Sequence, residues 1–331
     1  MGFFTNALVQ NITIGDNVKW LNNSMYNAFG GCVNFNSPVN IPEGITNLNS
    51  TFYNCRAFNQ PVTIPNSVQT LRSTFMYCYN FNQPVNVPNG VTTMFQTFYA
   101  CYNFNGALSL PQTVTNFDNA LCWCNNFNRG LTMPNSIVSM VYAFGYCSRM
   151  KVHHTVPSSV QNMAYAYYSC SNLKVRYSNL PESVVNLAYT YFGCTNFTVT
   201  SNEVIGNNVV NMAYAFYGCN NLQNNGQCKG IRIGKNVTNM AYAFGYSGIG
   251  MPNNIILMPS AVTCARAMLI GKTNTKRVNI ILQNNSAAVA PFIGNQALNS
   301  ITGSTTVWSW SGNNNYYNSK YNIWVQGMYQ L

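Results

Sequence analysis

Cysteine spacing constrains the fold of this chain more than any other feature, because it repeats at one fixed interval. Seven cysteines lie at regular intervals of 23 residues: Cys32, Cys55, Cys78, Cys101, Cys124, Cys147 and Cys170. Cys194 and Cys219 continue the series after 24 and 25 residues. Self-similarity at a fixed period of this size is typical of repeat architectures, in which similar units stack along one direction. The spacing therefore predicts a single continuous solenoid.

Two hydrophobic columns keep the register of the cysteines. The residue three positions before each cysteine is large and apolar or aromatic: Phe29, Phe52, Phe75, Phe98, Leu121, Phe144, Tyr167, Tyr191 and Phe216. A second column follows three positions after it: Phe35, Phe58, Phe81, Phe104, Phe127, Met150, Leu173, Phe197 and Leu222. One copy cannot bury such a face alone, so we expect stacked copies to join these faces into one core.

Each copy has two halves with different periodicity. Residues 61–64 alternate polar and apolar side chains, which predicts a short strand, and Pro65 ends it. The apolar residues of the second half fall on one helical face and predict a short helical turn: Val68, Leu71, Phe75 and Cys78. We therefore expect an α/β solenoid with short parallel strands and about eleven coils of roughly 23 residues.

These residues also carry a family resemblance. The pattern Ile-Pro-x-x-Val-x-x-Leu/Met-x-x-x-Phe-x-x-Cys-x-x-Leu/Phe resembles the BspA-type leucine-rich repeat. The Phe-Asn-Gln-Pro segments and residues 211–219, Asn-Met-Ala-Tyr-Ala-Phe-Tyr-Gly-Cys, are similar to its variant in bacterial surface lipoproteins. The resemblance covers residues 12–282 and implies a right-handed solenoid used in adhesion, mostly at microbial cell surfaces. It implies no catalytic residues.

The two ends of the chain depart from the repeat. An insertion around residues 20–24 marks residues 1–31 as an N-terminal capping coil, followed by the solenoid at 32–283. Beyond it the register vanishes, and the apolar segments 307–310 and 321–325 predict two strands of a hairpin-like cap. We therefore expect residues 284–331 to form a C-terminal β cap, which could also make an oligomer or attachment contact.

Regular polar columns have a structural interpretation. Cysteines in register on stacked coils have parallel Cβ vectors, which is poor geometry for disulfides, and only Cys122-x-Cys124 approaches the spacing of a metal site. We expect buried free thiols, no metal and no cofactor. A hydrogen-bonded amide ladder that satisfies backbone groups at the turn is predicted two positions after the cysteines: Asn34, Asn80, Asn103, Asn126, Asn172, Asn196 and Asn221.

A column two positions before the aromatic one changes chemistry along the chain. It begins with small polar residues and then becomes tyrosine: Tyr142, Tyr165, Tyr189, Tyr214 and Tyr242. On the helical interpretation this column points away from the core. Stacked tyrosines could bind sugar rings or a protein partner, because they offer a large contact area at low entropic cost. The alternative is that neighbouring tyrosines only pack on one another.

Charge supplies the remaining candidates. Only 6% of residues are charged, yet Lys and Arg number 16 against 5 Asp and Glu, for a net charge of +11. This balance favours acidic partners such as glycopolymers, lipid headgroups or nucleic acid. The candidate basic residues are Lys151, Lys174, Arg176, Arg232 and Arg266. They form either a polyanion-binding surface or a solvated basic face, and nucleic acid is disfavoured because no recognised motif accompanies them.

Enzymatic chemistry finds no support in the sequence. The five acidic residues lie in different copies, whereas polysaccharide hydrolysis needs paired carboxylates at a fixed separation. No nucleophile elbow, phosphate loop or HExxH motif occurs. His154 stands where other copies have Val or Leu, so we expect a hydrogen-bonded core residue there and not a ligand.

These observations lead to a functional expectation. The chain shows no secretory signal pattern and no apolar run long enough for a membrane span, so no membrane insertion is expected. We expect a recognition or decoration protein on a virion surface, such as a phage fibre or capsid-attached protein. It would bind a host-surface glycan or protein, contact other virion proteins through its C-terminal cap, and could form a homo-oligomer. A bacterial cell-surface adhesin and an intracellular protein–protein scaffold are the alternatives.

Overall fold

The computed structural model describes residues 4, 18–174, 180–198, 203–222, 230–247, 254–258, 268–269, 278–282, 309–310, 315–318 and 323–327. The chain forms two compact units. Unit 1 comprises residues 1–160 and 169–171, and unit 2 comprises residues 161–168 and 172–331. The predicted boundaries of the capping coil, solenoid and C-terminal cap stay predictions.

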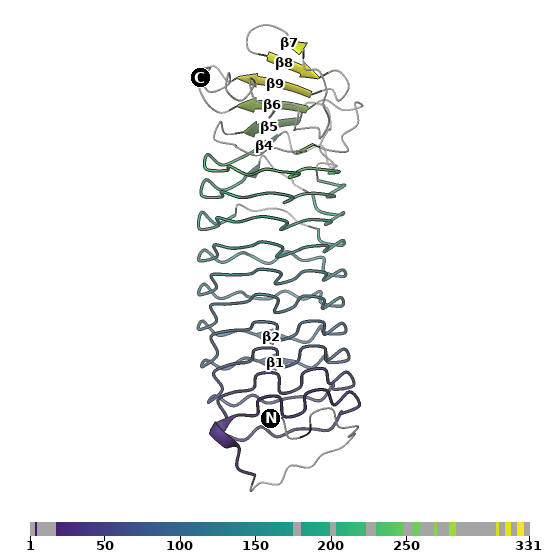
Figure 1. The fold of residues 1–331 in the computed structure, drawn as a ribbon, viewed down its shortest axis with the longest axis vertical. Coiled ribbons are helices and arrows are strands. Elements are labelled where there is room, and N and C mark those ends of the chain that lie inside the picture. Colours follow the sequence, from purple (N-terminus) through teal and green to yellow (C-terminus); the bar gives the residue numbers. More distant parts are fainter. Residues whose placement is uncertain are drawn as a thin grey trace. The chain divides into compact units, whose positions relative to one another are not determined.

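Unit 1 begins with a short 3₁₀ helix, η1 (Leu21–Asn23), and continues as coils stacked one on the next (Figure 1). Strands β1 (Val85–Asn86) and β2 (Leu108–Ser109) pair in parallel, with Val85 opposite Leu108. Parallel bridges also join Ser24 to Asn47 and Asn47 to Thr70. Each of these partners lies one repeat away in the sequence, which is the stacking that the cysteine register predicted.

The second half of each coil is not the predicted helical turn. Its backbone N–H groups alternate between two directions: Ser50 and Phe52 donate to the next coil, whereas Thr51 donates back to Leu48 within its own coil. This alternation needs left-handed residues, such as Ser73 at φ 54° and Tyr77 at φ 64°. A continuous helix would direct every N–H along its own axis and leave none for the neighbouring coil. Within the described residues, η1 is the helical segment.

The core of unit 1 is built from two files of phenylalanine. All members of both files are buried, and equivalent rings in neighbouring coils lie parallel, with Phe52 and Phe75 5.5 Å apart at 7°. Within one coil the two files also touch, as at Phe75 and Phe81, 4.4 Å apart. Each such pair contributes about 0.5–1.5 kcal/mol beyond its buried area. The apolar columns of the repeat are therefore core columns, as predicted.

The cysteine column adds hydrogen bonds to this core. The Sγ of Cys55 donates to the Phe29 carbonyl at 3.0 Å, and Cys78 and Cys101 repeat the contact with Phe52 and Phe75. The ten described cysteines are all buried. Burial raises the pKa of the Cys122 thiol to about 12 and raises the pKa of Cys78 as well. Because the thiolate is the reactive form, these side chains serve as small core residues, as predicted.

At Asn80, Asn103 and Asn126 the predicted amide ladder is present, but its hydrogen bonds join side chain to side chain and not, as predicted, side chain to backbone. A second ladder accompanies it. Asn103 Nδ2 donates to Asn80 Oδ1 at 3.2 Å, and Asn126 repeats this with Asn103. The second ladder lies two positions further on and satisfies backbone N–H groups. Its side-chain oxygens each accept from the equivalent residue of the next coil at 2.7–3.0 Å: Asn36, Asn59, Asn82, Asn105 and Asn128.

This backbone-directed ladder should contribute measurably to stability. Replacing Asn59, Asn82 and Asn105 together with alanine removes three acceptors, so we expect the free energy of unfolding to fall by about 2–3 kcal/mol. Urea denaturation followed by circular dichroism measures the change. Asn89→Ala is the matched control, since this exposed side chain makes no hydrogen bond within the described part of the chain. A triple variant as stable as the control would contradict the prediction.

Unit 2 repeats the coil geometry and ends in a sheet (Figure 1). Parallel bridges join Asn162 to Asn186, Asn186 to Asn211 and Asn211 to Asn239. The sheet has the strand order β3-β4-β5-β6-β9-β8-β7, parallel from β3 through β6 to β9 and antiparallel from β9 to β7. The strands are β3 (Glu203–Val204), β4 (Gly230–Arg232), β5 (Asn254–Met258), β6 (Val278–Leu282), β7 (Ser309–Trp310), β8 (Asn315–Asn318) and β9 (Ile323–Gly327).

The predicted terminal strands at 307–310 and 321–325 coincide with β7 and β9 to within two or three residues. Strand β8, between them, has no counterpart in the sequence prediction. It pairs with both neighbours, so three antiparallel strands stand where a two-stranded hairpin was expected. That this segment caps the solenoid or attaches it to something stays a prediction.

Candidate functional site

The tyrosine column forms a stacked file in unit 2. The rings of Tyr165 and Tyr189 lie 4.5 Å apart at 6°, those of Tyr189 and Tyr214 4.5 Å apart at 8°, and those of Tyr214 and Tyr242 4.6 Å apart at 12°. We call these four residues the tyrosine ladder. All four are half-buried. Tyr142, the fifth predicted member, belongs to unit 1 and is likewise half-buried.

A second aromatic file flanks the ladder. Tyr168, Phe192 and Tyr217 stack on one another at 4.8 and 4.9 Å, and Tyr168 meets Tyr165 at 5.7 Å with a tilt of 40°. These residues stand one position after the aromatic core column. In unit 1 that position holds Gly30, Met76 or Cys122, among others, so the sequence showed no pattern there. Only alignment of the unit 2 copies by themselves could have revealed the file.

Stacking decides what the ladder presents to a partner. Neighbouring rings cover one another's faces at van der Waals distance, so the exposed part of each half-buried ring is its edge and hydroxyl group. Burial, followed by the charge that neighbouring tyrosines would carry, raises the pKa of Tyr165 and Tyr189. The neighbouring hydroxyl of Tyr214 also raises the pKa of Tyr189. The ladder is therefore a row of neutral hydroxyl groups that can donate and accept hydrogen bonds.

The backbone under the ladder is unfavourable for tyrosine. Tyr165, Tyr189, Tyr214 and Tyr242 all have left-handed backbones, with φ between 54° and 60°. This conformation costs a bulky residue about 1–2 kcal/mol, and one stacked aromatic pair returns only about 0.5–1.5 kcal/mol. Equivalent positions in unit 1 adopt the same φ with Asn27, Ser50 and Ser73. The same backbone conformation thus forms with small polar residues at this position, so it does not depend on the rings.

The structure describes the side chains of only two of the five predicted basic residues. Lys151 is exposed in unit 1 and Lys174 is exposed in unit 2. The backbone of Arg232 lies in β4. Arg176 and Arg266 lie outside the described residues. A shared polyanion-binding surface stays a prediction.

Carboxylates and metal-binding side chains are the remaining candidates among the described residues. Asp118 is fully engaged, because its Oδ1 accepts from Ser139 and the Val141 N–H and its Oδ2 accepts from Asn116. No group of three or more His, Cys, Asp or Glu side chains within the described ranges could hold a metal ion. The helical segments of the same ranges include none of the length and apolarity that a membrane crossing requires.

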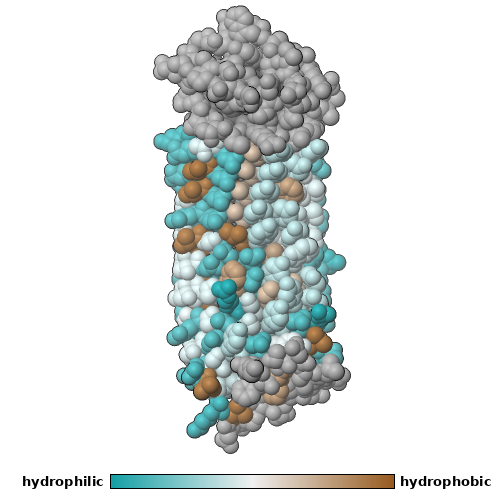
Figure 2. Space-filling view, viewed as in Figure 1, coloured by the Kyte–Doolittle hydropathy of each residue, from teal (hydrophilic) through white to brown (hydrophobic). Residues whose placement is uncertain are grey.

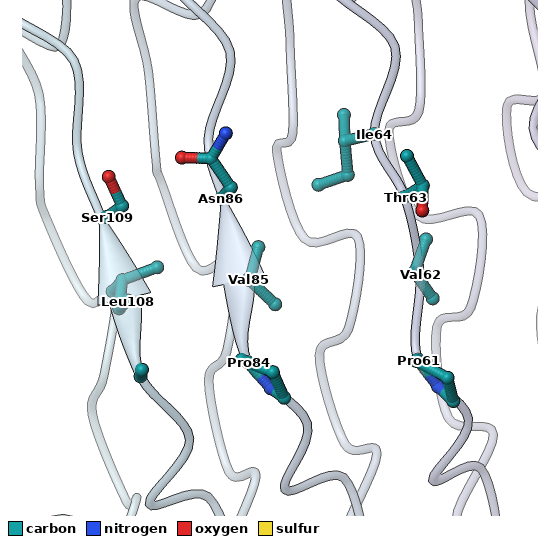
Figure 3. Close-up of a pocket in the computed structure, with 10 residues that line it drawn as sticks. Pro61, Val62, Thr63, Ile64, Pro84, Val85, Asn86, Leu108 and Ser109 are labelled. Carbon is teal, nitrogen blue, oxygen red and sulfur yellow. The ribbon is translucent and has the colours of Figure 1, made fainter.

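A shallow pocket opens on the strand half of unit 1 (Figure 3). It lies where the parallel backbone pairing of β1 with β2 does not extend to residues 61–64 of the preceding coil. Its wall consists of proline, aliphatic and small polar side chains: Pro61, Val62, Thr63, Ile64, Pro84, Val85, Asn86, Ala107, Leu108 and Ser109. No titratable or aromatic side chain lines it, so it supplies no chemistry that would single out a ligand.

Comparison with known proteins gives one family and two similar structures. The family model described as a Mycoplasma protein of unknown function, DUF285, matches residues 23–133 and 138–249. No curated protein matches the sequence. A leucine-rich repeat protein from Bacteroides ovatus is similar at 16% identity and a TM-score of 0.43, over 64% of this chain and 57% of that one. A leucine-rich cell surface protein from Faecalibacterium prausnitzii is similar at 17% identity and a TM-score of 0.36, over 85% and 79%.

Proposed function

This chain belongs to the DUF285 family of BspA-like repeat proteins, and we propose that it is a non-enzymatic recognition protein displayed on a surface. The family description itself states no function. The proposal rests on the BspA-type repeat, which is associated with adhesion, and on a composition with only 6% charged residues. The coloured part of the face in Figure 2 is mostly hydrophilic. We place the protein at a bacterial cell surface, because nothing in the comparisons points to the virion that the sequence led us to expect.

The tyrosine ladder is the observation that carries this proposal. Its rings are held by one another and by the coils, so little side-chain entropy is lost when a partner binds. Tyrosine is also the residue that recognition surfaces use most, since it combines an apolar ring with a hydrogen-bonding group. Because the backbone conformation does not depend on these rings, their recurrence in four successive coils supports a role in contact with a partner.

The geometry favours a protein partner for the ladder over a sugar. Docking of a sugar ring needs an open aromatic face, and stacking at 4.5–4.6 Å closes the faces between neighbouring ladder rings. A row of ring edges and hydroxyl groups instead suits a flat protein surface with backbone and side-chain hydrogen-bonding groups. We therefore propose a host-surface protein as the ligand of unit 2.

Removing the hydroxyl groups alone tests the role of the ladder. The triple variant Tyr165→Phe, Tyr189→Phe and Tyr214→Phe keeps the stacked rings, so the fold should be unchanged. Attachment should weaken at least about tenfold, since each hydrogen bond from a tyrosine hydroxyl to the partner contributes about 0.5–1.5 kcal/mol. Flow cytometry of labelled protein on host cells measures attachment, and circular dichroism checks the fold.

Tyr26→Phe is the matched control, because Tyr26 is 55% exposed and lies in unit 1, outside the ladder. Attachment of the triple variant at the level of this control would reject the ladder as the binding surface.

The location of the protein has a separate test by mass spectrometry. Finding the chain in purified phage particles, and not in the bacterial envelope fraction, would replace the cell-surface version of the proposal with the virion version.

A further inference from the structure

We propose that unit 1 carries a second, independent binding site, and that its ligand is a neutral glycan. The site is a cluster of tyrosines around the cysteine corner of three successive coils: Tyr53, Tyr77, Tyr79, Tyr99 and Tyr102. We call it the aromatic cup. None of its members belongs to the tyrosine column that the sequence singled out.

Ring geometry separates the cup from the ladder. Tyr77 meets Tyr53, Tyr99 and Tyr79 edge to face, at 5.7, 5.7 and 6.3 Å and at 74°, 89° and 87°. An edge-to-face contact uses the edge of one ring and a single face of the other, so it covers fewer faces than parallel stacking does. The outer members are well exposed, Tyr53 at 37% and Tyr102 at 39%. Parallel stacking occurs in the cup between Tyr79 and Tyr102, at 4.7 Å and 22°, so each ring of that pair has one face covered. The cup therefore leaves ring area exposed at Tyr53 and Tyr102, whereas the ladder rings are all half-buried.

The fold does not require aromatic residues at these positions. Asn54 stands one coil before Tyr77 in the same column, and Asn125 stands one coil after Tyr102. Tyr77 also has a left-handed backbone, with φ 64°, which Asn54 adopts at φ 56°. Asparagine tolerates this conformation better than tyrosine. As in the ladder, the backbone conformation of the coil does not depend on aromatic rings at these positions.

Amide groups border the cup in the same coils. Asn80 and Asn103 directly follow Tyr79 and Tyr102, and both are exposed. Their ladder uses one Nδ2 hydrogen of Asn103 and one lone pair of each side-chain oxygen. A carboxamide has two N–H donors and two acceptor lone pairs, so each exposed amide keeps a donor and an acceptor for a ligand. Sugar hydroxyl groups, which both donate and accept, match that pair.

Charge and ring chemistry define the ligand class. One face of a pyranose carries C–H groups of partial positive charge, which pack on the negative face of an aromatic ring. Arg56, a cation of the cup's own coils, already donates to Asn54 Oδ1 at 3.0 Å and lies 5.3 Å over the Tyr79 ring. Burial raises the pKa of Tyr77, which keeps its hydroxyl neutral. The cup thus offers ring faces and amides without a concentration of charge, and we infer that it binds a neutral hexose or N-acetylhexosamine polymer along the coils.

Direct binding to defined sugars tests the proposal. The probes are short oligomers of glucose, N-acetylglucosamine and mannose, titrated calorimetrically into the full chain after a glycan-array screen. At least one should bind, and the double variant Tyr79→Asn and Tyr102→Asn should bind about tenfold or more weakly. Asparagine occupies the Tyr102 column at Asn125, so this variant preserves the coil. Tyr26→Asn, in the same unit but outside the cup, should bind like the unaltered chain.

Three results would overturn the proposal: no neutral sugar on the array binds, binding occurs only to sulfated or sialylated sugars, or the double variant binds as tightly as Tyr26→Asn. The ladder variants give an independent comparison. The ladder variants should retain sugar binding while cell attachment falls. The cup variant should lose binding to the isolated sugar while cell attachment is kept. Failure of one site therefore leaves the other separately testable.

Discussion

Replacing Phe75 with alanine is expected to lower the free energy of unfolding by about 3–5 kcal/mol, the usual cost of deleting a buried aromatic side chain. Phe75 is fully buried and packs against phenylalanines of its own coil and of the adjacent coils. Its equivalents in the adjacent coils, Phe52 and Phe98, each lie 5.5 Å away. Phe81 lies at 4.4 Å and Phe58 at 6.5 Å. Because coils of a repeat protein are stabilised by their neighbours, one deletion weakens two interfaces.

Urea denaturation followed by circular dichroism measures this effect. Phe75→Leu should cost less than alanine, since Leu121 occupies the same column in another coil. Gln69→Ala, an exposed change in the same coil, should stay within about 0.5 kcal/mol of the unaltered protein. A destabilisation below about 1 kcal/mol for Phe75→Ala would mean that the phenylalanine files do not hold the coils together.

Acidification below about pH 6.5 is expected to destabilise the protein through His154 and its neighbour His153, and His154→Val should reduce that sensitivity. His154 is 3% exposed and stacks on Phe144 at 4.5 Å. Its Nε2 lies 3.0 Å from the Arg129 carbonyl, which confirms the hydrogen-bonded core histidine predicted from the sequence. A carbonyl only accepts, so Nε2 carries the proton, and Nδ1 is buried without a hydrogen-bond partner among the described residues.

The direction of the pH effect follows from the direction in which burial shifts the pKa of the histidines. Burial lowers the pKa of His154, and burial followed by the neighbouring His154 lowers the pKa of His153 to about 3. The unfolded chain therefore takes up a proton before the folded chain does. Stability is complete above the ordinary histidine pKa and falls as the pH drops below it, by up to about 1.4 kcal/mol per pH unit for each histidine.

Thermal unfolding at pH 7 and at pH 5 measures the effect. The difference in melting temperature should shrink in His154→Val, whose new side chain matches Val62 and Val85 in the equivalent column. Thr155→Val, an exposed neighbouring change, should leave the difference as it is. Equal acid sensitivity in the two variants would show that His154 is not kept in its neutral form by burial in the core.

The repeat register predicted the core because it depends only on which residues recur. Phe75, Cys78 and Phe81 were assigned to buried columns from spacing, and all three are buried. The register could not predict the backbone of the second half. Apolar residues at positions such as Val68, Leu71 and Phe75 fall on one face of a helix, and equally on one face of a coil that contains two left-handed residues. Glycine usually marks such residues, but here most are Asn, Ser, Gln or Tyr.

The candidate surfaces were predictable to different degrees. The tyrosine ladder follows one column through successive copies, so repetition alone identified it. The aromatic cup uses three different columns, with Tyr53, Tyr77 and Tyr79 each at another position relative to the cysteine. Only the folded coils bring those columns to one corner. Spacing left open whether the ladder tyrosines bind sugar rings, bind a protein or only pack on one another. The face-to-face stacking of the ladder rings is the reason we propose a protein.

The left-handed position two residues before the aromatic core column has an evolutionary consequence. Its backbone is set by hydrogen bonds to the next coil, and the same φ holds whether the residue is Asn27, Ser73, Gln96 or Tyr189. A mutation there changes what one coil displays without altering the packing of the Phe and Cys columns. Specificity can therefore evolve one coil at a time, and duplication of a coil copies its binding residue together with its framework.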